Sequence, residues 1–173
     1  PDAFHFSDDV HEFPYVLWDD ARAITNPENA LILALSAGVA IGIRQDWDDQ
    51  VRAETAEHPL RWGAGSRVLG SLGEAQYQIP VLASSWALSV WNDDPAFHDF
   101  NETLISAYTL SGLATLAIKG VTNPSRPDSD WNGGHWGFPS YHASSAFTIA
   151  SVLEEHYGWR AAVPAIVSVF DVR

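Results

Sequence analysis

Signals that start a helix recur along this chain, and they constrain its fold more than any other feature. Residues 26–28, Asn-Pro-Glu, combine an N-cap residue, a proline at the first helical position and an early acid, and residues 94–95, Asp-Pro, repeat the first two. A third start is expected at Ser140, which follows a proline. Because patterns typical of strands are scarce between these points, the sequence predicts an all-α helical bundle.

Apolar residues at helical spacing, and the glycines and prolines between them, predict five main helices. These helices cover residues 27–43, 75–92, 96–119, 141–157 and 160–173. Pro80 is expected to kink the second helix, and Gly158 is a natural C-terminal cap for the fourth. Residues 46–54 are predicted as a short surface helix, and residues 120–139 as an irregular loop rich in glycine and proline.

The helix predicted over 96–119 carries an apolar face. Its apolar side chains recur at mostly helical spacing at Phe100, Leu104, Tyr108, Leu113 and Leu116. A hydrophobic content of 46% is enough for a core, and a length of 173 residues predicts one domain, residues 1–173. The chain contains no methionine and opens on Pro1, from which we expect an incomplete fragment or a processed product.

The chain is strongly acidic, with a formal net charge of −13 and a pI near 4.6. Nucleic acids and anionic membrane surfaces are bound by basic patches, so this charge argues against both as partners. The acidic runs, residues 7–13, 44–50 and 91–100, are interpreted as solvated faces and loops.

The sequence predicts neither a metal site nor an integral membrane protein. The chain has no cysteine, and four of its histidines lack the spacing of zinc ligands. These are His5, His11, His58 and His98. The apolar stretch 30–43 is too short to span a bilayer, and the stretch 75–92 carries polar residues and Pro80. A mean hydropathy of −0.08 favours a soluble chain.

The only lysine of the chain, Lys119, ends a predicted helix, and Arg126 follows seven residues later. A tetrahedral oxyanion such as phosphate needs fixed positive charge and N–H donors, which an arginine fork and a lysine ammonium supply. The helix start at Ser140 adds free backbone N–H groups at residues 141–143 and the positive end of a helix dipole. His142 lies in that first turn, and histidine is the side-chain type most often used as an acid catalyst near neutral pH.

Each of these residues alone has an ordinary structural explanation. Lys119 fits a charge at a helix C-terminus, and Arg126 fits a surface ion pair with an acid such as Asp128. Ser140 fits a simple helix cap, and His142 a hydrogen bond at a helix start. Together, the single lysine, the K-x6-R-P spacing and the Pro-Ser-x-His stretch favour an oxyanion-binding site.

The stretches KGVTNPSRP (119–127) and GFPSYHASSAF (137–147) resemble the first two signatures of the type 2 phosphatidic acid phosphatase superfamily. This superfamily includes lipid phosphatases, bacterial non-specific acid phosphatases and vanadium haloperoxidases. The resemblance is strongest over residues 103–158. It implies a helical bundle of that type and a phosphate site without a metal, in which vanadate can mimic phosphate.

The resemblance also implies roles for single residues. Lys119 and Arg126 would bind phosphate oxygens, Ser140 and the backbone N–H of Tyr141 would donate hydrogen bonds, and His142 would be the general acid. The implied activity is hydrolysis of a phosphomonoester, on a phosphorylated small molecule or a lipid phosphate, through a phosphohistidine intermediate. The implied location is periplasmic or otherwise extracytoplasmic, with the protein soluble or associated with a membrane surface. A vanadium-dependent haloperoxidase and a non-catalytic oxyanion-binding module are the alternatives.

The family's third signature, S-R-x5-H-x3-D, supplies another phosphate-binding arginine, the histidine nucleophile and an aspartate that orients this histidine. Residues 172–173, Val-Arg, match its start with valine in place of serine. Helices over 142–157 and 160–173, joined by a short turn, would run antiparallel and return Arg173 to the neighbourhood of His142. The nucleophile is then expected just beyond Arg173.

Tyr141 departs from the family pattern, which has glycine at this position. The backbone N–H is retained, but a positive φ would be costly for tyrosine, and the ring would narrow the pocket or stack on a substrate. This departure and the incomplete third signature favour the non-catalytic alternative.

Aromatic side chains in the predicted loop have two interpretations. Trp131, Trp136 and Phe138 either pin the loop to the bundle or form a wall for an apolar substrate. His135 could contact a ligand, whereas His156, at the far end of its helix, is expected to be structural.

Overall fold

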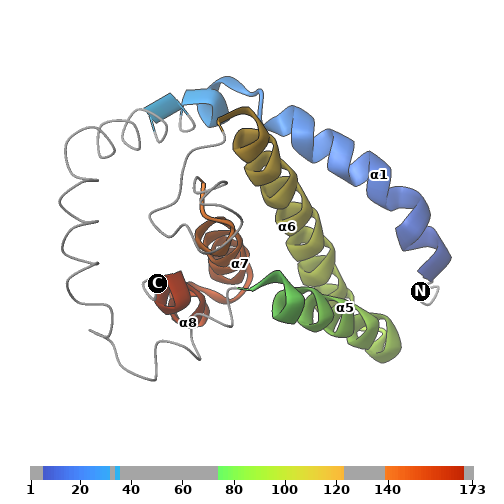
Figure 1. Ribbon diagram of the computed structural model, residues 1–173. Coiled ribbons are helices and arrows are strands. Elements are labelled where there is room, and N and C mark those ends of the chain that lie inside the picture. The colour runs from blue at the N-terminus through green and yellow to red at the C-terminus, as the bar shows by residue number, and fades with distance from the viewer. Residues whose placement is uncertain (1–5, 32–33, 36–73, 123–138, 170–173) are drawn as a thin grey trace. The chain divides into compact units, whose positions relative to one another are not determined.

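The computed structural model describes residues 6–31, 34–35, 74–122 and 139–169, which are helical apart from short turns and contain no strand (Figure 1). Its main helices are α1 (Phe6–Ala23), α5 (Ala75–Asn92), α6 (Pro95–Thr122), α7 (Tyr141–Tyr157) and α8 (Trp159–Val169). The predicted all-α class is confirmed. A further helix begins at Pro27, as the sequence predicts, and the part of that prediction beyond residue 35 lies outside the described residues.

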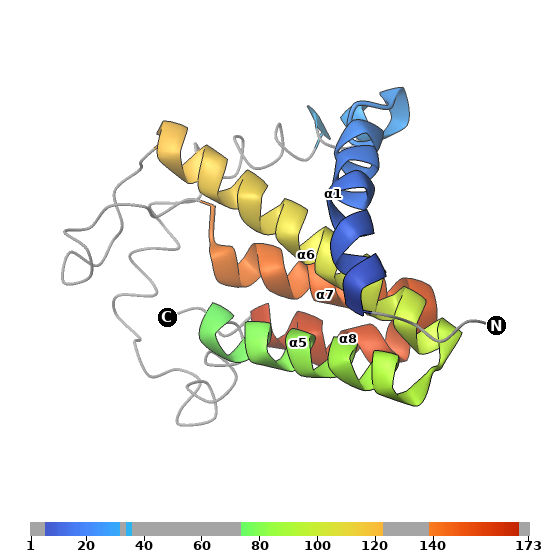
Figure 2. The same cartoon turned by 90° about the vertical axis from the view of Figure 1, so that its right-hand side faces the viewer.

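Consecutive helices from α5 to α8 pack against one another and alternate in direction (Figure 2). As a result, the C-terminal end of α6 and the N-terminal end of α7 lie at the same end of the bundle. The chain divides into two compact units, Pro1–Phe13 with Trp62–Arg173, and Pro14–Arg61. The helices α5 to α8 belong to the first unit. In the second unit, the Arg22 guanidinium lies 5.2 Å from the ring centroid of Trp18.

The boundaries of three helices follow local signals. Helices α5 and α7 span the predicted residues. Helix α6 begins at the predicted Asp-Pro signal, where Asp94 Oδ1 accepts hydrogen bonds from the backbone N–H groups of Ala96 at 3.0 Å and Phe97 at 3.2 Å. Helix α6 continues to Thr122, so residues 120–122, which were predicted as loop, are helical.

Two helix ends within the α5–α8 segment use a residue with a positive φ. Asp93 closes α5 with φ 50°, and its N–H donates to the Val90 carbonyl. Gly158 closes α7 with φ 81° and donates its N–H to the Glu154 carbonyl at 2.8 Å. The predicted cap at Gly158 is confirmed, because glycine adopts a positive φ without steric cost.

The core of the bundle is built around Leu82, Phe100, Leu104, Tyr108 and Val152. Leu113 and Leu116, which share the apolar spacing of this helix in the sequence, lie outside the core and are 57% and 50% exposed. Beyond Tyr108, the inward-facing residues of α6 are Gly112, Thr115 and Lys119, which follow at helical spacings of four, three and four residues. The face of α6 that packs on α7 is therefore small and polar at its C-terminal end, and the leucines lie beside it.

Two acidic runs are more structured than the sequence indicates. Residues 7–13 belong to α1 and are mostly exposed, so they form a solvated helix face and not a loop. In the run 91–100, His98 and Phe100 are only 4% and 6% exposed, so its interpretation as a wholly solvated segment is wrong. Both residues lie on the inward face of the first turns of α6, which the capping carboxylate of Asp94 starts.

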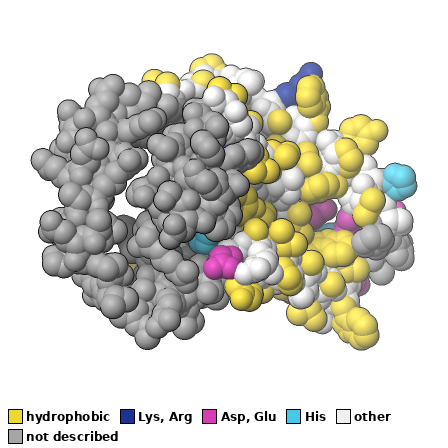
Figure 3. Space-filling view, viewed as in Figure 1, with side chains coloured by type: hydrophobic (Ala, Val, Ile, Leu, Met, Phe, Trp, Pro, Cys, Tyr) yellow, Lys and Arg dark blue, Asp and Glu magenta, His cyan; other side chains and the backbone are white. Residues whose placement is uncertain are grey.

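Apolar side chains spread over the described surface, including that of α5 and α6 (Figure 3). Among the described helices, one is long and apolar enough to cross a membrane by length and composition alone, and it covers Pro95–Val121 of α6. A third of its most apolar window is buried within the described structure. Neither of the two stretches considered in the sequence, 30–43 and 75–92, is this helix.

Candidate functional site

Lys119 lies in the last turn of α6 and is only 5% exposed. A buried ammonium is costly unless other groups compensate its charge, and Lys119 does have an interaction partner in this structure. A lysine that only complements a helix dipole lies at the surface as a rule. Its burial therefore favours the interpretation as part of a site over that of a solvated helix-end charge.

The N-terminus of α7 is capped by Ser140, as predicted. Ser140 has extended backbone angles, and its Oγ accepts a hydrogen bond from the Ala143 N–H at 3.4 Å. The backbone N–H groups of Tyr141 and His142 precede the first intrahelical donor, so they remain available to an anion. The side chains of Ser140 and His142 are exposed, which leaves them accessible to a ligand from solvent.

A hydrogen bond between two hydroxyl groups joins α6 to α7 beside these residues. Thr115 Oγ1, one turn before Lys119, donates to Ser144 Oγ, one turn after Ser140, at 2.9 Å. Thr115 is 3% exposed, so this bond is shielded from water. It brings the end of α6 that carries Lys119 next to the start of α7.

Tyr141 does not behave as its departure from the family pattern predicts. Tyr141 is the first residue of α7. Among the described residues only Asp93 and Gly158 have a positive φ, so Tyr141 does not carry the backbone strain that a positive φ would cause. Its ring packs against α6, 6.2 Å from the ring of Tyr108 in an edge-to-face arrangement. Its hydroxyl lies 3.5 Å from the position that a Cβ would take at Gly112. The ring thus fills the groove left by this glycine.

Tyr108 links this packing to α5. Its hydroxyl donates to Gln78 Oε1 at 2.8 Å, and both residues are buried. Burial, followed by the neighbouring Tyr141 hydroxyl, raises the pKa of Tyr108 well above its usual range. Tyr108 therefore stays neutral and serves as a hydrogen-bond donor in the core.

Several predicted site residues cannot be placed. Arg126, Arg173 and the loop residues between 123 and 138 lie outside the described residues. The described part of the predicted site therefore consists of Lys119, the cap at Ser140, and the first turn of α7. His156, at the other end of α7, packs edge-on against Phe100 with ring centroids 5.4 Å apart, as a structural side chain would.

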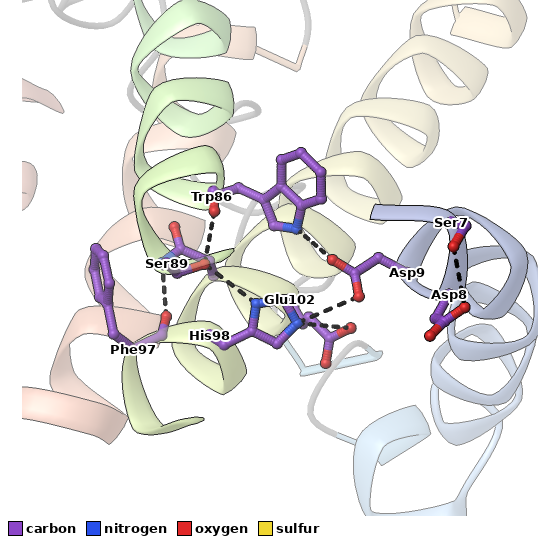
Figure 4. A network of polar contacts seen from close by, with 9 residues as sticks. Ser7, Asp8, Asp9, Trp86, Ser89, Phe97, His98 and Glu102 are labelled. Carbon is purple, nitrogen blue, oxygen red and sulfur yellow. Dashed lines mark hydrogen bonds and ion pairs between the residues drawn. The ribbon is translucent and has the colours of Figure 1, made fainter. Parts of the chain in front are cut away.

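A second polar cluster was missed in the sequence. His98 Nε2 lies 3.4 Å from Asp9 Oδ1 and 3.8 Å from Glu102 Oε1 (Figure 4). Burial is the main cause that raises the pKa of Glu102, and Asp9 adds to this, whereas His98 opposes it. The i, i+4 spacing of His98 and Glu102 was visible in the sequence, but their approach to Asp9 of α1 depends on the tertiary structure.

Comparison of the chain with protein-family models, with curated proteins and with solved structures finds no match.

Proposed function

We propose that the chain is a phosphoesterase domain of the type 2 phosphatidic acid phosphatase kind, which hydrolyses a phosphomonoester through a phosphohistidine. One observation carries this proposal. The hydrogen bond from Thr115 to Ser144 holds the buried Lys119 beside the capped helix start at Ser140, in the order and spacing of the two signatures. A cation and a helix N-terminus at one place form a site for a tetrahedral anion.

In this proposal, the phosphoryl group lies at the start of α7. Its oxygens accept hydrogen bonds from the first-turn N–H groups and from Lys119, joined by Arg126 and Arg173. These donors also stabilise the charge that develops on the equatorial oxygens during transfer. None of these steps requires a metal ion.

Bond making and breaking follow the family's chemistry. The histidine of the third signature, expected beyond Arg173, attacks phosphorus in line, and the bond to the leaving oxygen breaks as His142 gives that oxygen a proton. Water then attacks the phosphohistidine and returns a proton to His142, and the P–N bond breaks to release phosphate. The exposed position of His142 in the first turn of α7 gives it access to the leaving group.

A substrate with an apolar portion, such as a lipid phosphate, fits the surroundings of this site best. Leu113, Leu116 and Val121 are all at least half exposed and lie on the C-terminal part of α6, on either side of Lys119 in the chain. Such apolar surface on an exposed helix favours contact with acyl chains or with the surface of a membrane. An extracytoplasmic location, as in the related lipid phosphatases, is part of the proposal.

Titration calorimetry with orthovanadate and inorganic phosphate tests the site. We expect Lys119→Ala to weaken binding by about 10- to 100-fold, the value of one charge-assisted hydrogen bond. Arg160→Ala is the matched control, because Arg160 is an exposed cation of α8 that stacks on Trp159 at 5.5 Å. Equal binding by wild type and Lys119→Ala would refute the site. Bromide oxidation after addition of vanadate and peroxide would instead indicate a haloperoxidase.

A further inference from the structure

Three side chains that commonly bind metals converge between the start of α1 and the start of α6. Asp9, His98 and Glu102 each offer one ligand atom, and these atoms lie within 4.8 Å of one another. The two nitrogen–oxygen distances at His98 Nε2 are 3.4 Å and 3.8 Å. Ligands about 2.0–2.1 Å from a tetrahedral zinc ion are separated by about 3.4 Å, so the spacing is close to what an ion needs.

The hydrogen bonds around His98 fix which ring nitrogen faces the carboxylates. Ser89 Oγ donates its single hydrogen to the Trp86 carbonyl at 2.7 Å, so it can only accept from His98 Nδ1 at 3.2 Å. The ring hydrogen is therefore on Nδ1. Nε2, the other ring nitrogen, faces the carboxylates of Asp9 and Glu102, so positive charge at this position stabilises the cluster, whether a second ring proton or a bound cation supplies it.

Asp9 is also oriented by a hydrogen bond to one of its two polar atoms. Its Oδ2 accepts a hydrogen bond from the indole N–H of Trp86 at 3.0 Å, while its Oδ1 faces His98 (Figure 4). Outer contacts of this kind, which orient a ligand side chain through its other polar atom, are typical of metal sites. His98 is 4% exposed and the Asp9 side chain 15%, so these two groups are largely shielded from water, while Glu102 lies at the solvent edge of the cluster.

We propose that Asp9, His98 and Glu102 bind a divalent transition-metal ion such as Zn²⁺, which joins the first turns of α1 to α6. One imidazole nitrogen and two carboxylates suit this class of ion, and a fourth position remains for water. Glu12 and Asp99 add further negative charge near Glu102, which favours a doubly charged ion at the cluster.

This ion would have a structural role. His98 and Lys119 are 21 residues apart on one helix, which corresponds to about 32 Å at 1.5 Å per residue. The metal cluster is thus remote from the proposed phosphate site. Loss of the ion is expected to loosen the N-terminal helix and to leave phosphate binding unchanged.

The test uses the chain freed of metal by a chelator and titrated with Zn²⁺, followed by calorimetry and thermal unfolding. We expect one ion per chain, a rise in the melting temperature, and visible absorption bands when Co²⁺ replaces Zn²⁺. Glu102→Gln and Asp9→Asn keep the shape of each side chain and should weaken Zn²⁺ binding by about tenfold or more, since loss of even an outer contact costs that much. Asp9→Asn also keeps a side-chain oxygen that can accept the hydrogen bond from the Trp86 indole N–H.

The exposed His11 of α1 provides the control for zinc that binds to surface histidines. His11→Gln should bind Zn²⁺ like the wild type. Circular dichroism of each metal-free variant verifies that it is folded, and Glu102→Gln is the mildest change, because the Glu102 side chain is 40% exposed. Absence of Zn²⁺ binding by the wild type, or equal binding by a folded Glu102→Gln variant, would overturn the proposal.

Discussion

Thr115 of α6 and Ser144 of α7 are joined by a hydrogen bond of 2.9 Å between their hydroxyl oxygens. Ser144 Oγ donates its own hydrogen to the Tyr141 carbonyl at 3.1 Å, so it is fixed as the acceptor for Thr115. The pair sets the register of α6 against α7 at the end of the bundle where Lys119 and Ser140 lie.

Thr115→Val should remove the hydrogen bond that sets this register while it leaves the positive charge of Lys119 in place. Valine keeps the shape of threonine but leaves the Ser144 oxygen without its donor, which costs about 1–3 kcal/mol of unfolding free energy. Phosphate binding should weaken but persist, because Lys119 is retained. Urea unfolding and phosphate titration measure the two effects.

Thr148→Val is the control for this change. Thr148 Oγ1 donates to the Ser144 carbonyl at 2.8 Å within α7 and makes no bond to α6 through that contact. We expect phosphate binding by Thr148→Val to equal that of the wild type. A parallel loss of binding in both variants would mean that general loosening of α7, and not the link to α6, is responsible.

Two substitutions of Ser140 should have different effects on stability and binding. Ser140→Ala removes the cap of α7, which costs about 1 kcal/mol of stability. Ser140→Asp keeps a good cap and nearly wild-type stability, but its carboxylate occupies the helix N-terminus and repels phosphate. Strong phosphate binding by Ser140→Asp would place the anion elsewhere. Thermal unfolding and calorimetry give both quantities.

Tyr141→Gly restores the residue of the family pattern, and we expect it to harm this protein. The ring lost from between Tyr108 and Gly112 leaves a cavity, and glycine is also unfavourable in a helix, so the expected cost is about 3 kcal/mol. Phosphate binding by the folded fraction should not improve, because the backbone N–H is the same in both. Tyr141→Phe, which keeps the ring, is the control in denaturant unfolding.

Stability should fall steeply in alkali because of Tyr108. Its pKa is raised in the folded state, so between the unfolded and folded values the unfolded chain releases a proton that the folded chain keeps. The contribution of neutral Tyr108 to the free energy of unfolding is intact below about pH 10. As the pH rises further, this contribution is lost by up to about 1.4 kcal/mol per pH unit. Tyr108→Phe should flatten this dependence in unfolding curves at pH 9–11. An unchanged slope would mean that Tyr108 ionises normally in the folded protein.

Local signals were enough to predict much of the fold. The bounds of α5 and α7, the start of α6 at its Asp-Pro pair and the cap at Gly158 all depend on neighbours within a few residues, and the sequence shows those neighbours directly. Helix α1 was missed, because its acidic run resembles a solvated loop and Pro14 lies inside it.

By itself, the sequence determined that the chain is helical, where α5 and α7 begin and end, where α6 begins, and that Ser140 caps the helix that carries His142. Only the tertiary structure decided that Lys119 is buried, that the ring of Tyr141 packs on α6, and that Asp9 meets His98. Helix caps and turns arise from contacts within one turn of chain, whereas burial and side-chain direction depend on which helix packs on which face. That choice involves residues far apart in the sequence, and no local pattern encodes it.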